Sequence, residues 1–201
     1  MSAVPTWSTT DRVLGEVEVS VLRVQGGSPD LVRVHAWVSE ERARFWGMVG
    51  RSLEEVTRIY RFLDGLETHH AWMVRVGGRA AALLQTYQPE HDPVGDCYPV
   101  QEGDLGLHLL LGPAEDAPGA GFTGRLGAAL APWFFADPGV QRLVVEPDAR
   151  NEKAVARLRR SGFELGPEIE LPTKRAVLAF LTRGRFEALQ QLAAHGAPTP
   201  A

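Results

Sequence analysis

The stretch PGAGFTGRL, residues 118–126, carries three glycines, Gly119, Gly121 and Gly124, immediately before the helix-like run LGAALAPWFF. It follows GLHLLLG (106–112), an apolar run typical of a short buried strand. A glycine turn between a strand and a helix exposes backbone N–H groups at a helix start, which carries about half a positive charge. The stretch therefore predicts a site for a phosphate or pyrophosphate.

The three glycines also match the spacing GxGxxG, for which two other interpretations exist. A dinucleotide-binding fold would place this turn after its first strand, with several strand–helix–strand units beyond it. Here the turn follows strands that are expected to be mostly antiparallel, and fewer than half of the residues remain, which argues against that fold. A purely structural turn, with glycines chosen for positive φ and close packing, stays open.

The rest of the chain predicts strands and helices in a mixed order. Before the turn we expect strands at 15–24 and 31–38, helices at 39–50 and 52–66 capped by Ser39 and Ser52, and a hairpin at 69–88 through Gly77 and Gly78. After it we expect a helix from 126, a strand at 141–147, a helix at 151–163 stopped by Gly162, and a strand at 175–182. The run RFEALQQLAAH near the C-terminus is amphipathic and could pack on the domain or on a partner.

Composition narrows the class of protein. The 201 residues, 44% hydrophobic and 23% charged, suit one soluble domain, with residues 1–14 and 196–201 expected to be flexible. A net charge of -4 gives no footprint for nucleic acid. No apolar run reaches the roughly 20 residues of a membrane span, and the N-terminus lacks the features of a signal peptide. We therefore expect a cytoplasmic protein without a membrane partner.

Cysteine and histidine usage gives no sign of a metal site. Cys97 is the only cysteine, so neither a disulfide framework nor a thiolate cluster can form, and we take this residue as structural. His69 and His70 are adjacent, and neighbouring side chains on a strand point to opposite faces. We predict no metal.

The element order around the glycine turn resembles the Gcn5-related acetyltransferase (GNAT) superfamily. The resemblance includes Asn151, Ala154 and the pair Gly162–Phe163 after the next strand. It implies an α/β (α+β) fold with a central mixed, mostly antiparallel sheet, splayed between the fourth and fifth strands and flanked by helices. It also implies acyl-CoA, as acetyl-CoA or succinyl-CoA, with its pyrophosphate on the turn.

Four longer blocks resemble the lysine N-acyltransferases of siderophore biosynthesis. They are HAWVSEERARFWGM (35–48), GDLGLHLLLGP (103–113), EPDARN (146–151) and LPTKRAVL (171–178). In that family the histidine and aspartate of these blocks are the proposed active-site pair, here His108 and Asp148. The alternatives are a hydrogen-bonded strand histidine and an aspartate that caps the following helix.

The resemblance also assigns residues to acyl-CoA and to the acceptor. Backbone groups of the fourth strand and the turn, with the start of the next helix, would bind acyl-CoA: Leu109, Leu110, Leu111, Gly119, Ala120, Gly121, Phe122, Thr123, Gly124 and Asn151. Trp37, Trp46 and Lys174 would contact the acceptor. The two tryptophans could instead lie in the core, and Lys174 could be a solvated charge at a strand start.

Three positions depart from the usual GNAT pattern. Pro118 precedes the first glycine and has no N–H to donate, and Thr123 stands where glycine or alanine is usual. Leu158 occupies the position at which many of these enzymes carry a tyrosine that protonates the leaving thiolate. That acid is therefore not available to this chain.

Three functions remain open. The first is an acyl-CoA-dependent N-acyltransferase that forms the hydroxamate of a siderophore from N-hydroxylysine or N-hydroxycadaverine, or that acylates the lysine side-chain amine. The second is a GNAT enzyme acting on a protein N-terminus, a drug amine or a polyamine. The third is a non-catalytic acyl-CoA-binding module, which the loss of the usual acid at Leu158 favours.

Overall fold

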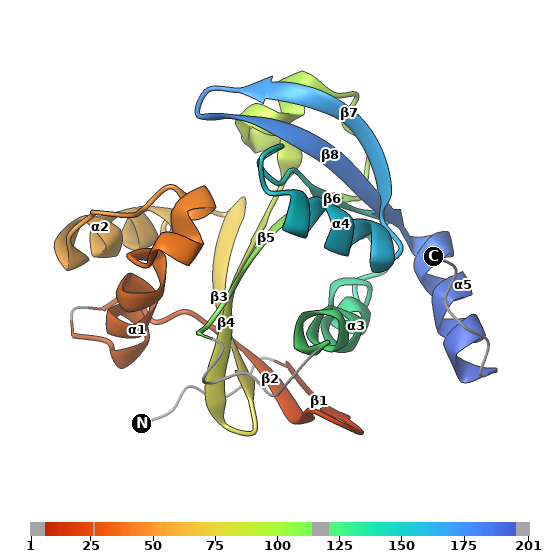
Figure 1. The fold of residues 1–201 in the computed structure, drawn as a ribbon, viewed down its shortest axis with the longest axis horizontal. Coiled ribbons are helices and arrows are strands. Elements are labelled where there is room, and N and C mark those ends of the chain that lie inside the picture. Colours follow the sequence, from red (N-terminus) through yellow and green to blue (C-terminus); the bar gives the residue numbers. More distant parts are fainter. Residues whose placement is uncertain (1–6, 26, 114–120, 196–201) are drawn as a thin grey trace. The chain divides into compact units, whose positions relative to one another are not determined.

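The computed structural model describes residues 7–25, 27–113 and 121–195, and the strands of these residues form one mixed sheet with the order β1-β2-β3-β4-β5-β6-β8-β7 (Figure 1). Its strands are β1 (Trp7–Asp11), β2 (Gly15–Val21), β3 (His69–Val76), β4 (Arg79–Tyr87), β5 (Asp104–Leu111), β6 (Arg142–Val145), β7 (Glu164–Leu171) and β8 (Lys174–Thr182). The pair β5–β6 is parallel, whereas β1–β2, β2–β3, β6–β8 and β7–β8 are antiparallel. This is the mixed, mostly antiparallel sheet that the resemblance predicts.

The parallel pairing between β5 and β6 is short. It joins Asp104–Gly106 to Arg142–Val144, although β5 continues to Leu111. These strands precede and follow the glycine turn and its helix, so they correspond to the fourth and fifth strands of the family pattern.

The chain divides into two compact units, which are described separately. The first unit comprises Met1–Thr86 and His108–Ala129, and the second comprises Tyr87–Leu107 and Leu130–Ala201. In the first unit, helices α1 (Pro29–Val38) and α2 (Leu53–Asp64) contact each other, and α2 also contacts β3 (Figure 1). Their buried faces form one hydrophobic core with β3, β4 and the end of β5, including Val34, Tyr60 and Leu83.

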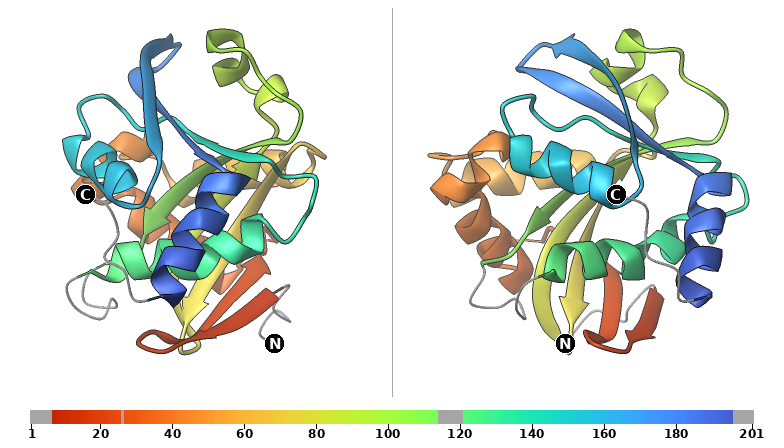
Figure 2. Two further views of the ribbon diagram at one scale, coloured as in Figure 1. Left: turned by 90° about the vertical axis from the view of Figure 1, so that its right-hand side faces the viewer. Right: turned by 45° about the vertical axis from the view of Figure 1, so that its right-hand side comes forward.

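The second unit contains the antiparallel strands β6, β8 and β7 with the helices α4 (Glu152–Arg160) and α5 (Arg183–Ala194). Figure 2 shows β7 and β8 as a long twisted pair, with α5 following directly from the end of β8. Phe186 of α5 stacks on Phe135 at a ring distance of 4.6 Å, so the amphipathic C-terminal run packs within this unit. Two short 3-10 helices, η2 (Pro89–His91) and η3 (Pro93–Cys97), lie in the loop before β5.

Several elements agree with the sequence prediction. Helix α2 begins at Ser52, whose hydroxyl accepts a hydrogen bond from the Glu55 backbone while Glu55 accepts one from Ser52, a complete capping box. The hairpin of β3 and β4 turns at Gly77 and Gly78, as expected. Helix α4 ends before Gly162, as predicted. Helix α3 (Phe122–Phe134) begins earlier than the predicted residue 126, so Gly124 lies inside the helix and not in the turn before it.

The strand predicted at 31–38 is wrong, because these residues lie in α1. Pro29 occupies the first turn, and the buried residues Leu31, Val34 and Val38 recur at helical spacing. This spacing outweighs the β-branched side chains that suggested a strand. The helix predicted from Ser39 is also wrong: Ser39 ends α1, and a 3-10 helix, η1 (Glu41–Trp46), follows.

Two strands were missed. Trp7–Asp11, placed in the flexible first 14 residues by the sequence, forms the strand β1 paired with β2, so that expectation is wrong for this segment. β7 contains Gly166 and Pro167, two residue types that are unfavourable inside a strand, and a register shift between Leu165 and Glu168 accommodates them. Both strands lie at the ends of the sheet order, where fewer backbone groups need a partner.

Candidate functional site

His108 lies on β5 in the first unit, between the half-buried residues Leu107 and Leu109. Its Nδ1 atom is 3.3 Å from Oε1 of Gln85, a residue of the neighbouring strand β4. The oxygen of Gln85 can only accept, so a hydrogen bond at this contact requires the proton on Nδ1. In that tautomer the lone pair of the imidazole is on Nε2.

Trp46 packs against the same imidazole. The two rings meet edge to face, with their centroids 6.1 Å apart and their planes at 77°. The Trp46 Nε1–H donates to the hydroxyl of Tyr60, 3.3 Å away, and Tyr60 is fully buried on α2. Burial raises the pKa of the Tyr60 hydroxyl, which therefore stays protonated. Trp46 is partly buried against the core and also contacts the His108 ring.

The segment before α2 also contacts the end of β5. Arg42 of η1 donates from Nη1 to the backbone oxygen of Leu111, and its Nε donates to Glu40. Trp37 is only 3% exposed and lies in the core of the first unit. Its ring covers Gly112, where an added Cβ would approach the indole to 2.9 Å. Trp37 therefore adopts the core position that the sequence offered as its alternative.

The glycine turn is described from Gly121 onward; Gly119 and Ala120 lie outside the described residues. Gly121 has φ +85°, a conformation that other residues rarely adopt, and Phe122 begins α3. A Cβ added at Gly121, Gly124 or Gly127 would meet no atom of the described part of the chain within 4 Å. Among the described residues, no side chain therefore crowds these three glycines.

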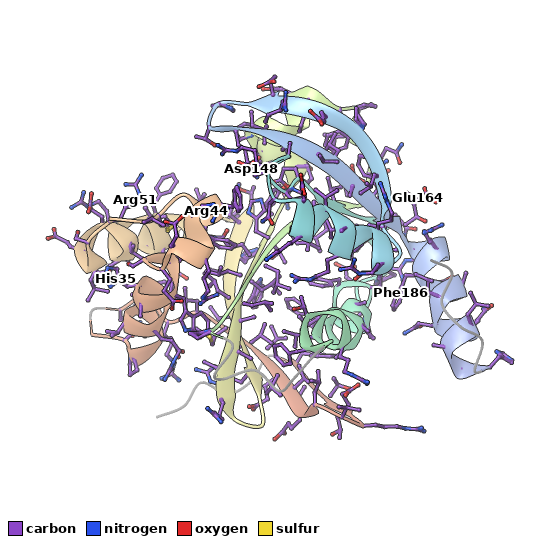
Figure 3. The ribbon with its side chains drawn as sticks, in the orientation of Figure 1. His35, Arg44, Arg51, Asp148, Glu164 and Phe186 are labelled. Carbon is purple, nitrogen blue, oxygen red and sulfur yellow. The ribbon has the colours of Figure 1, made fainter. Side chains whose placement is uncertain are left out.

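Asp148 lies in the second unit, between β6 and α4 (Figure 3). It is 5% exposed, and its backbone forms an isolated bridge to Ala176 next to β8. Both carboxylate oxygens accept hydrogen bonds from Arg150: Oδ1 from Nε at 2.9 Å and Oδ2 from Nη2 at 2.7 Å. The Arg150 side chain is the main cause of a lowered pKa of Asp148. Asp148 is therefore an ionised hydrogen-bond acceptor of low basicity.

The Asp148–Arg150 pair predicts how the stability of the protein and the titration of Asp148 depend on pH. A carboxylate with a lowered pKa stabilises the fold at pH values above its unfolded pKa, near 4, and loses that contribution as the pH falls through the folded pKa. We expect Arg150→Ala to raise the pKa of Asp148, because the guanidinium hydrogen bonds are lost. A carboxyl ¹³C NMR titration of Asp148 measures this shift, with Arg175→Ala, which removes an exposed pair with Glu168, as the control. An unchanged Asp148 titration in Arg150→Ala would contradict this interpretation.

A second polar cluster in the same unit surrounds Glu146, directly after β6. Its side chain is 3% exposed; Tyr87 donates to Oε2 at 2.7 Å, and Lys174 Nζ lies 3.2 Å from Oε1 and 2.6 Å from the Glu146 backbone oxygen. Burial, and then the charge of Glu146, raise the pKa of Tyr87, so its hydroxyl remains a donor. Lys174, which the resemblance assigns to the acceptor, donates to Glu146 in this structure. Asn151 accepts from the Ala154 backbone and so caps α4.

The sequence did not single out Gln85, Tyr60, Tyr87 or Glu146. Gln85 interrupts the apolar run AAALLQTY of β4, and a lone amide in such a run is a signal for a buried polar contact. Glu146 similarly follows the apolar run LVV. The partners of these residues could not be read from the sequence, because they come from distant segments.

The described residues contain no group of three or more His, Cys, Asp or Glu side chains arranged to hold a metal ion. Nor do they contain a helix of the length and hydropathy required to cross a membrane.

Comparison with curated proteins finds relatives that are named for hydroxylated amines. The chain is 25% identical over 168 residues to the N(6)-hydroxylysine O-acetyltransferase of Escherichia coli, covering 82% of this chain and 52% of that protein. It is 29% identical over 119 residues to the N-hydroxyputrescine acetyltransferase of Acinetobacter baumannii, covering 58% and 55%. The chain thus spans about half the length of the curated relatives it matches.

Solved structures support the fold. An uncharacterised protein from Bacillus halodurans superimposes with a TM-score of 0.86 at 23% identity, covering 97% of this chain and 99% of that chain. The aminoglycoside acetyltransferase AAC(6')-Ib, in complex with coenzyme A, superimposes with a TM-score of 0.74 at 23% identity, covering 87% and 99%. The family described as "Acetyltransferase (GNAT) domain" matches residues 27–171, well over half of the sequence. The chain therefore belongs to the GNAT acetyltransferase family.

Proposed function

We propose that this protein is an acyl-CoA-dependent N-acyltransferase of hydroxamate siderophore biosynthesis, acting on N-hydroxylysine or N-hydroxycadaverine. The observation that carries the proposal is the imidazole of His108 on β5, the strand that leads to the glycine turn. The names of the two curated relatives, which specify a hydroxylated lysine and a hydroxylated diamine, support the choice of acceptor.

The start of α3 fits the phosphates of coenzyme A. The N–H groups of residues 119–124 would hold the pyrophosphate, helped by the positive end of the helix dipole. No described side chain crowds Gly121 or Gly124, which supports this assignment, because a side chain there would obstruct the approach of a phosphate to the backbone. When bound, acyl-CoA supplies a thioester whose acyl carbon accepts the nucleophile.

His108 would act as the proton acceptor. As the acceptor nitrogen forms its bond to the acyl carbon and the C–S bond breaks, the proton of that nitrogen passes to Nε2 of His108, and coenzyme A leaves as the thiolate. A backbone N–H among Leu109, Leu110 and Leu111 would polarise the acyl oxygen. Asp148 is a weak base because of Arg150, so we assign it the orientation of the acceptor.

A hydroxylated acceptor suits such a site. An alkyl amine has a pKa of about 10.4 and is almost entirely protonated at neutral pH, so it must lose a proton before it can attack. A hydroxylamine nitrogen is much less basic and is already neutral. His108 therefore needs only to accept the proton that is released during acylation.

The proposal is tested by the release of free coenzyme A. Purified protein is incubated with acetyl-CoA or succinyl-CoA and with N-hydroxylysine or N-hydroxycadaverine, and the free thiol is measured against a polyamine, an aminoglycoside and a peptide N-terminus. We expect release with at least one hydroxylamine at a kcat/KM above that of every other acceptor. If only the other amines released thiol, the protein would be a different amine acetyltransferase. If no acceptor did while the protein still bound coenzyme A, the protein would be a binding module.

A further inference from the structure

Gln85 is a half-buried amide in a strand whose neighbouring residues Leu84 and Thr86 are buried. Placing an amide in such surroundings costs free energy unless it forms hydrogen bonds. Its oxygen faces Nδ1 of His108 at 3.3 Å, across 23 residues of sequence. The contact therefore connects a polar residue without a role in the mechanism above to the group that takes the proton there.

The contact fixes one of two tautomers. A neutral imidazole carries its proton on either Nδ1 or Nε2, and an isolated ring favours Nε2–H, in which Nε2 cannot accept a proton. The Gln85 oxygen stabilises Nδ1–H instead, which leaves the lone pair on Nε2. In addition, the indole of Trp46, which donates to Tyr60, packs against the imidazole and limits its rotation.

We propose that Gln85 is a positioning residue that holds His108 in the Nδ1–H tautomer and so presents Nε2 to the acceptor. The proposal rests on the function proposed above for its role in catalysis, but the tautomer itself does not depend on the reaction. Because the orienting group is a neutral amide, it fixes the tautomer without adding a negative charge beside the ring. A carboxylate at position 85 would also stabilise the protonated imidazolium.

The first test reads the tautomer without activity. In protein labelled with ¹⁵N-histidine, at a pH where His108 is neutral, the imidazole nitrogen shifts identify the protonated nitrogen. We expect Nδ1–H in the wild-type protein and a population shifted towards Nε2–H in Gln85→Met, which keeps the length of the side chain but has no oxygen. Nε2–H as the main tautomer of the wild-type protein would overturn the proposal, whatever reaction the protein catalyses.

The second test uses the reaction and a double-mutant cycle. We expect Gln85→Met to lower kcat about ten-fold with little change in the KM for acyl-CoA, and to have no further effect when His108 is already alanine. In Gln85→Glu we expect the acid limb of the kcat/KM pH profile to move to higher pH by about one unit. An equal loss from Gln85→Met with and without His108, or an unmoved pH profile in Gln85→Glu, would show that Gln85 does not act through the imidazole.

If neither Gln85 variant can be measured because the wild-type protein acylates no amine, the proposed function fails, and the tautomer test still decides this inference. Thermal unfolding of both variants serves as the control for folding. The pair is informative because methionine and glutamate match glutamine in length and differ from it in the group placed beside Nδ1.

Discussion

Replacing His108 by alanine is expected to lower kcat for hydroxylamine acylation by about 10²- to 10⁴-fold, the range typical of a lost general base. The KM for acyl-CoA should change little, because the pyrophosphate is assigned to the turn before α3 rather than to this side chain. Leu158 stands where related enzymes have a tyrosine acid, so that residue cannot take over the proton transfer. In this account, His108 is therefore the only side chain assigned to accept the proton of the acceptor nitrogen.

The measurement is steady-state kinetics with thiol detection, together with calorimetric binding of coenzyme A to the same variant. His91→Ala is the matched control, since His91 is an exposed histidine in η2 and should leave the rate unchanged. A His108→Ala protein that retains the full kcat would remove this residue from the mechanism. Loss of coenzyme A binding together with activity would instead indicate a structural defect.

Replacing Glu146 by alanine is expected to destabilise the protein by about 3–5 kcal/mol, a large part of the roughly 5–15 kcal/mol that stabilises a typical domain. The substitution leaves the Tyr87 hydroxyl without its acceptor at 2.7 Å and leaves the Lys174 ammonium without its carboxylate. Tyr87 is buried, so its unpaired hydroxyl is costly, whereas the Lys174 side chain is 20% exposed and keeps its contact with the Glu146 backbone oxygen.

Urea denaturation of the purified variant measures this loss. Glu146→Gln should cost less, because an amide oxygen still accepts from one of the two donors. Glu168→Ala is the matched control: Glu168 pairs with Arg175, both side chains are more than half exposed, and such pairs contribute about 0–1 kcal/mol. Equal destabilisation by Glu146→Ala and Glu168→Ala would contradict the role assigned to the buried cluster.

The close approach of Tyr87 explains the glycine at position 106. A Cβ added at Gly106 would lie 2.2 Å from the Tyr87 ring. Gly106 is also the last residue of β5 that pairs with β6. The tyrosine thus passes over β5 where the pairing ends and reaches Glu146 just beyond β6. The sequence alone could not show this, because a glycine in a strand does not reveal which side chain lies against it.

Local signals in the sequence predicted those elements that are stabilised locally. The capping box at Ser52 defines the start of α2, and the pair Gly77–Gly78 defines the hairpin of β3 and β4. The predictions of secondary structure were wrong where packing against the core decides between a helix and a strand. Residues 31–38 are rich in β-branched side chains, but α1 buries Leu31, Val34 and Val38 against the core of the first unit.

The candidate site shows the same division. His108 and Asp148 were found through the blocks that resemble a family, and their assignment to catalysis stays a prediction. The hydrogen-bond partners of these two residues were not equally predictable from the sequence. Arg150 is two residues from Asp148, whereas Gln85 is 23 residues from His108. The low basicity of Asp148 follows from the geometry of its two hydrogen bonds, which the residue types alone do not specify.

The most direct test of the account is a competition between N-hydroxycadaverine and cadaverine, at equal concentration and neutral pH, for limiting acetyl-CoA or succinyl-CoA. The products are identified by mass spectrometry and by their colour with ferric iron, which a hydroxamate binds and an O-acyl product does not. At neutral pH, fewer than about one in 10³ of the amine groups of cadaverine is neutral and able to attack the thioester. The account predicts an iron-binding hydroxamate as the main product; a main product of acylated cadaverine, or an acylated hydroxylamine that fails to bind iron, would contradict it.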